Sequence, residues 1–153
     1  MTPLLADRIV VRASRERLWE LLRSPDQLAR VLPGCEELRE IAPDMFEGTF
    51  RTKVQFLTLR ARSTVRLLDL EPPERLRLEV DGRPLGLAGA FVVSIPLELA
   101  EDGGGTLVGY AMSLNVSGRL ATFGAPLLRE TARRQVQELV RNLERELGGE
   151  RAE

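Results

Sequence analysis

The segment "SRERLWELLRSPDQLARVLPGCEEL", residues 14–38, decides the fold. Ser14 can cap a helix, and apolar residues then recur at helical spacing as far as Ser24. Ser24-Pro25 breaks this helix, and "DQLARVL" predicts a second short helix that ends at Pro33-Gly34. The segment therefore consists of two short helices that lead into the start of a strand.

Strands are predicted on both sides of this segment. The expected strands are residues 4–11, 45–56, 59–70, 74–80, 90–99 and 106–116. The turns expected between them are residues 71–74, 81–84 and 102–105. Apolar and polar residues alternate in "MFEGTFRTKVQF" and "LRARSTVRLLDL", which is typical of antiparallel strands with one buried and one solvated face. The rows of arginine in these strands fit the solvated face.

The last element is a long helix that is expected to start near Ser117 and to end at Gly148. Its apolar residues form one stripe, and Gly124 and Pro126 are expected to weaken and kink it. A polar tail is expected from about residue 148. This order of elements predicts an α+β fold in a single domain, residues 1–153. In this fold a curved antiparallel sheet of about seven strands wraps around the long C-terminal helix.

The composition excludes several classes of function. With 22 basic and 23 acidic residues, the net charge of −1 argues against a nucleic-acid partner, because phosphate binding needs a concentrated positive field. The chain has no histidine, which excludes catalytic triads with an imidazole base and most zinc sites. No acidic cluster falls on an inward strand face, so no metal, cofactor or catalytic residue is expected.

The sequence also indicates where the protein works. One cysteine cannot form an internal disulfide, so a reducing compartment, the cytoplasm, is expected. The N-terminal "MTPLLADRIVVRAS" lacks the features of a signal peptide. The most apolar stretch, residues 84–100, contains Pro96 and Glu98 and is shorter than the roughly 20 residues that span a bilayer. A soluble protein is therefore expected.

Cys35 has two interpretations, a catalytic nucleophile or a small, partly buried structural residue. A nucleophilic cysteine needs an activator such as a helix N-terminus or a nearby cation. Cys35 instead follows the end of a helix, where the dipole disfavours a thiolate. The adjacent Glu36 and Glu37 are expected to raise its pKa. The structural interpretation is therefore favoured.

The inward faces of the sheet predict a cavity. Long strands closed by one helix enclose more volume than a chain with 5% aromatic residues fills. The small residues expected on the inward faces are Gly48, Ala61, Ser63 and Ala111. The side chains expected to line the cavity and bind a ligand are Phe50, Val54, Phe56, Ala61, Ser63, Leu78, Phe91, Val93, Tyr110, Met112, Leu120, Phe123, Leu127 and Thr131. Among them, Ser63, Tyr110 and Thr131 supply the polar groups that a small-molecule site uses. An ordinary filled core is the alternative.

At this point the chain resembles a known group of proteins. The strand, two small helices, meander and closing helix resemble the helix-grip proteins of the START and Bet v 1 type (SRPBCC) superfamily. Within it, the sequence is most similar to the CoxG family, the G subunit of carbon monoxide dehydrogenase. The similar segments are residues 14–38, "VRLLDLEPPERLRLEV" (65–80) and "VSGRLATFGAPLLRETARR" (116–134). The resemblance extends from about Leu4 to Leu147.

The resemblance implies a protein without enzymatic activity. Such a protein binds a hydrophobic small molecule, lipid-like or quinone-like, between the sheet and the long helix. It would be an accessory or carrier for a molybdenum hydroxylase of the carbon monoxide dehydrogenase type. Some relatives extend beyond the long helix with a membrane-binding tail. This chain stops at Glu153, so at most a transient contact with the inner face of the membrane, through Leu85 and Leu87, is expected.

Two other functions remain open. The first is a helix-grip enzyme of the cyclase, hydratase or hydrolase kind, which would use Tyr110 or Asp69 in the cavity. The second is a protein-interaction module in which side chains fill the core completely.

Overall fold

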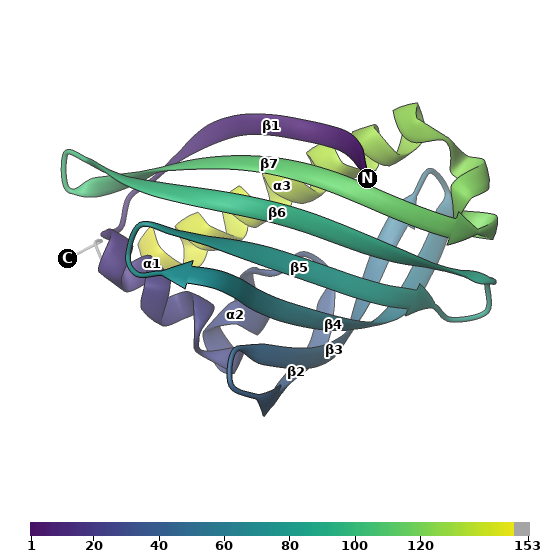
Figure 1. Ribbon diagram of the computed structural model, residues 1–153, viewed down its shortest axis with the longest axis horizontal. Helices are drawn as coiled ribbons and strands as arrows, with labels where there is room; N and C mark the ends of the chain where they lie inside the picture. Colours follow the sequence, from purple (N-terminus) through teal and green to yellow (C-terminus); the bar gives the residue numbers. More distant parts are fainter. Residues whose placement is uncertain (149–153) are drawn as a thin grey trace.

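The computed structural model describes residues 1–148, within which seven antiparallel strands curve around one long helix (Figure 1). The strands are β1 (Thr2–Val11), β2 (Cys35–Ala42), β3 (Met45–Val54), β4 (Leu57–Glu71), β5 (Arg75–Pro84), β6 (Gly89–Asp102) and β7 (Gly105–Gly118). The helices are α1 (Arg15–Leu22), α2 (Pro25–Val31), the 3₁₀ helix η1 (Arg119–Phe123) and α3 (Ala125–Gly148). This arrangement confirms the predicted fold class. The expected polar tail lies outside the described residues, apart from Gly148 itself.

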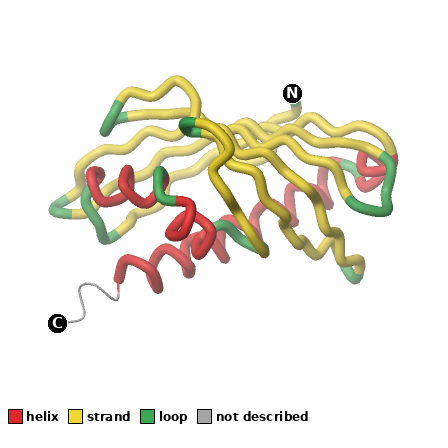
Figure 2. The backbone as a smooth tube through the Cα atoms, turned by 90° about the horizontal axis from the view of Figure 1, so that it is seen from below, coloured by secondary structure: helices red, strands yellow, loops and turns green. Residues whose placement is uncertain are grey.

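The sheet is a meander with one addition. Strands β2 to β7 follow one another in space, and β1 pairs with β7 at the far edge, in the order β1-β7-β6-β5-β4-β3-β2. Every neighbouring pair is antiparallel. Because the sheet is long and twisted, it curls, and α3 lies along its concave side (Figure 2).

The two short helices form for the expected reasons. The hydroxyl of Ser14 accepts a hydrogen bond from the Arg17 amide at 3.1 Å, which caps α1. The hydroxyl of Ser24 caps α2 in the same way, accepting from the Gln27 amide at 3.3 Å. Pro25 occupies the first turn of α2, where no backbone donor is needed.

The turn expected at residues 81–84 is wrong, because β5 continues to Pro84 and the chain reverses at residues 85–88. Gly82 pairs with Ser63 on one side and with Phe91 on the other. A Cβ atom on Gly82 would lie 2.5 Å from the Ser63 Oγ and 2.7 Å from the Phe91 ring. The glycine is therefore required by close packing inside the sheet.

The start of the long helix also differs from the prediction. Strand β7 runs as far as Gly118, and η1 follows as a separate short turn. Gly118 and Gly124 flank η1 with φ of 70° and 82°, a region that favours glycine. The main helix begins at Ala125, so Pro126 lies in its first turn and costs no hydrogen bond. The expected kink is therefore wrong.

Side chains of α3 fasten it to the sheet on both sides and to α2. Arg129 Nε donates to the carbonyl of Leu4 in β1 at 3.0 Å. Gln135 Nε2 donates to the Thr52 hydroxyl in β3, also at 3.0 Å. Further along, the buried Asn142 donates to the carbonyl of Val31 at the end of α2 at 3.0 Å. The helix therefore spans the concave side between both arms of the sheet.

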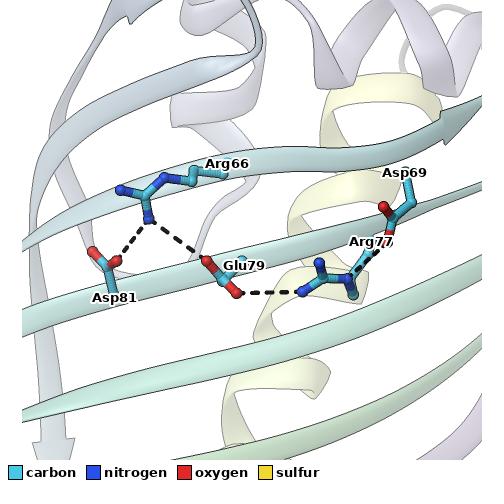
Figure 3. Close-up of polar contacts among 5 residues, drawn as sticks. All are labelled: Arg66, Asp69, Arg77, Glu79 and Asp81. Carbon is cyan, nitrogen blue, oxygen red and sulfur yellow. Dashed lines mark hydrogen bonds and ion pairs between the residues drawn. The ribbon is translucent and has the colours of Figure 1, made fainter.

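The convex face carries the rows of charge that the alternating sequence predicts. Figure 3 shows Arg66 of β4 between Asp81 and Glu79 of β5, with Nη1 at 2.7 Å and 3.6 Å from their carboxylate oxygens. Arg77 in turn pairs with Glu79 at 3.3 Å and with Asp69 at 2.9 Å. Acidic and basic groups thus neutralise one another across neighbouring strands. This pattern fits the solvated face and offers no isolated basic patch.

Candidate functional site

The concave side of the sheet is filled at only one end. There, α1 and α2 lie beside the C-terminal half of α3, and Leu21, Leu28 and Val31 are buried with Leu143 and Leu147 in one cluster (Figure 2). The N-terminal half of α3 crosses the other end of the sheet, beyond the reach of the two short helices. Side chains leave a cavity between helix and sheet at this end.

The main cavity has a volume of about 290 Å³. This is near the lower end of the roughly 300–1,000 Å³ that is usual for ligand pockets. Its wall comes from the inward faces of β3 to β7 and from one stripe of α3. The expected residues that line it are Phe50, Val54, Ala61, Ser63, Leu78, Phe91, Val93, Met112, Leu120 and Thr131. Because a cavity is present, the interaction module with a completely filled core is not the structure observed.

A second, smaller chamber of about 130 Å³ extends toward α1 and α2. The two share wall residues, which are Leu32, Leu78, Ile95, Met112, Val136 and Leu139. Tyr110, expected in the ligand site, lines the smaller chamber. The two spaces therefore form one elongated apolar site that follows α3.

The wall of the main cavity is almost entirely apolar. Among the described residues that line it, the polar ones are Thr52, Ser63, Thr131 and Gln135, and none is charged. The Thr131 hydroxyl donates to the carbonyl of Leu127 at 3.0 Å, and Gln135 holds Thr52. The wall therefore favours a neutral, mainly hydrophobic occupant, because a charged group would lose its hydration without compensation.

Three of the expected residues lie outside both cavity walls. Phe56 is 91% exposed in the turn between β3 and β4, because β3 ends at Val54 and Gln55 adopts a φ of 57°. Phe123 lies in η1, and Leu127 is half-buried on α3. The continuous helix expected from Ser117 would have given these two residues the wrong spacing. The expected inward position of Phe56 is wrong.

Ala111, expected among the small inward residues, is also misplaced. It is exposed on the convex face. Tyr110 and Met112 on either side of it line the cavity walls, and consecutive residues of a strand face opposite sides.

Sequence reasoning missed part of the wall. The missed residues are Leu4, Leu32, Pro33, Thr52, Leu59, Val65, Val80, Pro84, Ile95, Leu114, Val116, Leu128, Ala132, Gln135, Val136 and Leu139. On α3, residues 128, 131, 132, 135, 136 and 139 follow the helical repeat, so the apolar stripe was the usable signal. Leu32 and Pro33 have no such signal, since their position depends on how α2 lies against the sheet.

The candidates for chemistry lie elsewhere or are poorly suited to it. Cys35 is half-buried at the start of β2, and burial, followed by the charges of Glu37 and Glu36, raises the pKa of its thiol. Asp69 is on the convex face, paired with Arg77 at 2.9 Å, so its expected place in the cavity is wrong. Burial, and then the charge of Asp7, raises the pKa of Tyr110 and keeps the phenol protonated. Within residues 1–148, no three metal-binding side chains gather.

Comparisons with known proteins agree with this geometry. A family model described as the G subunit of carbon monoxide dehydrogenase (CoxG) matches residues 8–148. A conserved protein from Geobacillus kaustophilus is 20% identical, with a TM-score of 0.83 and 93% of each chain covered. A protein from Thermus thermophilus is 16% identical, with a TM-score of 0.65 and 93% and 94% covered. The Bet v 1-like protein Ara h 8.0201 is 12% identical, with a TM-score of 0.62 and 92% and 93% covered. No curated protein matches the chain.

Proposed function

The chain belongs to the CoxG family of carbon monoxide dehydrogenase, and we propose that it binds a hydrophobic small molecule without catalysing a reaction. The observation that carries the proposal is the cavity of about 290 Å³ between the sheet and α3. Its lining, drawn from the described residues, includes no charged side chain. An apolar pocket with a few polar groups is the usual form of a small-molecule site.

Titration with a neutral apolar fluorophore, N-phenyl-1-naphthylamine, tests the proposal. We expect saturable binding to the wild type and its loss in Ala61→Phe, because Ala61 lies on the cavity wall and the larger side chain occupies the space. Phe123→Trp is the control, since Phe123 is outside the lining, and its affinity is expected to match the wild type. If the wild type does not bind, or if Ala61→Phe binds equally well, the cavity is not a ligand site.

The proposal extends to the role in the cell. The occupant is lipid-like or quinone-like, and the protein is an accessory or carrier for a molybdenum hydroxylase of the carbon monoxide dehydrogenase type. The family match supports this association. The test is to purify the tagged chain from its own cells, to identify co-purifying proteins and to extract bound lipids. A component of a molybdenum hydroxylase is the expected partner, and its absence under conditions of hydroxylase expression contradicts the accessory role.

A transient membrane contact is the last part of the proposal. Exposed apolar side chains lie on two neighbouring turns: Phe56 (91%), Leu57 (43%) and Leu85 (50%). The cavity reaches this end of the sheet, since Val54 and Pro84 line it. Aromatic and aliphatic side chains at such a rim can enter the interface of a bilayer. No helix in residues 1–148 is long and apolar enough to cross a membrane.

Vesicle flotation tests the contact. Phe56→Ser is expected to reduce the fraction that floats with phosphatidylglycerol-containing vesicles. Ile41 is the control position, because it is an exposed apolar residue (45%) near the β2–β3 turn, at the opposite end of the strands. Ile41→Ser is expected to float like the wild type. Equal flotation of all three proteins, or none, contradicts a contact through this rim.

A further inference from the structure

Ser63 has an unusual environment. It lies in the middle of β4 and is 2% exposed, with its hydroxyl on the wall of the main cavity. Within residues 1–148, its Oγ has no hydrogen-bond partner. Buried hydroxyl groups in folded proteins nearly always have one, and a missing bond destabilises the fold. A hydroxyl retained here needs a reason outside the fold itself.

The other polar groups of the wall are already engaged. The Thr131 hydroxyl donates to a carbonyl of its own helix, and the Gln135 amide donates to the Thr52 hydroxyl. Tyr110 lines the smaller chamber rather than the main cavity. Among the described polar residues of the main cavity, Ser63 is therefore the one that can offer a hydrogen bond at no cost to the protein.

The strands beside Ser63 leave its hydroxyl accessible. Gly48 in β3 and Gly82 in β5 are its direct neighbours across the sheet. A Cβ on Gly82 would meet both the Ser63 Oγ and the ring of Phe91, so these two groups converge on the bare backbone of Gly82. The hydroxyl is thus bordered by glycine and by the edge of an aromatic ring, and Phe91 also lines the cavity.

We infer that Ser63 anchors the occupant of the cavity by a hydrogen bond from its hydroxyl to a neutral oxygen of the ligand. The inference rests on the proposed function and names the ligand class: an uncharged, mainly hydrocarbon molecule with a carbonyl oxygen beside the Phe91 ring. A carboxylate or an amine does not fit, because the described lining offers no opposite charge. A hydrocarbon fits the wall but leaves the serine unpaired.

A matched set of ligands tests the anchor. The probes are 2-decanone, n-decane and decanoate, which share a chain length and differ in the oxygen and its charge. Each competes with N-phenyl-1-naphthylamine for the wild type and for Ser63→Ala. In the wild type the ketone is expected to bind roughly two- to tenfold more tightly than the alkane, as one net hydrogen bond provides. Decanoate is expected to bind most weakly.

In Ser63→Ala, the preference for the ketone over the alkane is expected to disappear while the alkane still binds. Ser94→Ala is the matched control, because Ser94 lies between Val93 and Ile95, which line the cavity, and so points to the convex face. It is expected to keep the preference. The melting temperature of ligand-free Ser63→Ala is expected to equal or exceed that of the wild type, since the substitution removes an unpaired buried hydroxyl.

The outcomes separate the anchor from the proposed function. If the wild type binds ketone and alkane equally, or if Ser63→Ala keeps the preference, the anchor is wrong and the cavity remains a ligand site. A lower melting temperature for ligand-free Ser63→Ala shows that the hydroxyl supports the fold, which also overturns the anchor. If the wild type binds none of the probes, the proposed function fails and the anchor fails with it.

Discussion

At the scale of single residues, close contacts inside the sheet explain several choices that composition does not. Gly82 is the clearest case, because it is flanked by Ser63 and Phe91 with no space for a Cβ. The alternating pattern "ERLRLEV" followed by Asp-Gly-Arg-Pro suggested a turn at this point. The glycine instead permits a tight inward contact within a continuing strand.

Gly82→Ala is therefore expected to destabilise the protein by about 1–3 kcal/mol, the usual cost of overpacking a core. The new methyl group would also push against the backbone carbonyl of Arg62, at 2.9 Å, which cannot move far. The control is Gly109→Ala in β7, where the nearest atom would be the Arg8 Cγ at 3.9 Å. Urea denaturation measures both, and equal midpoints for the two variants would contradict the packing argument.

Cys35 gives a prediction about pH. Burial and the neighbouring glutamates raise the pKa of its thiol, so at a given pH a smaller fraction is thiolate than in the unfolded chain. The rate of iodoacetamide labelling in the native protein is expected to rise at a higher pH than in the chain unfolded in guanidinium. A native midpoint at or below the unfolded one would instead indicate an activated cysteine.

At the scale of elements, the short signals near Ser14 and Ser24 were sufficient because capping is local. The long helix was harder. Apolar residues from Leu120 onward fit a helical stripe, and periodicity alone cannot show that Gly118 and Gly124 adopt positive φ and detach η1 from α3. The end of β3 was missed for a similar reason. Phe56 continues the alternation, but the backbone turns at Gln55.

The docking of α3 depends on a buried amide. Asn142 donates to the Val31 carbonyl at 3.0 Å and accepts from Arg145 at 2.6 Å. Asn142→Ala leaves the carbonyl at the end of α2 without its donor, and is expected to cost about 1–3 kcal/mol. Thermal unfolding by circular dichroism measures the loss. Arg141→Ala, on the exposed side of the same turn, is expected to change little, and an equal loss there would contradict the specific role of Asn142.

At the scale of the whole molecule, the protein divides into a filled end and an end with a cavity. The residues of α1 and α2 complete the core around Leu143 and Leu147, whereas the sheet around Ser63 has only α3 opposite it. The fold class and most inward strand positions were predictable, since a period of two residues fixes which side chains share a face. Contributions such as Pro33 and Leu4 were not, because they depend on tertiary placement.

Ligand binding is expected to stabilise the whole protein. A neutral apolar ligand at about 100 times its dissociation constant contributes roughly 2.7 kcal/mol if it binds the native state alone. In a chain of this size that corresponds to a rise of roughly 5–10 °C in melting temperature. Differential scanning calorimetry should show this shift for the wild type and none for Ala61→Phe. A ligand that binds without any shift in the wild type would have to associate outside the folded cavity.

The pairing of β1 with β7 has a consequence for how the protein is made. Thr2 lies opposite Leu114, and Val11 lies opposite Thr106, so the first strand can pair only after the last one has been synthesised. Contacts between such distant parts of the chain form late and slow the folding reaction. While the ribosome still holds the C-terminal part, the growing meander exposes an apolar face with no helix to cover it. That unfinished sheet is a natural substrate for chaperones, and cargo can be loaded only after synthesis is complete.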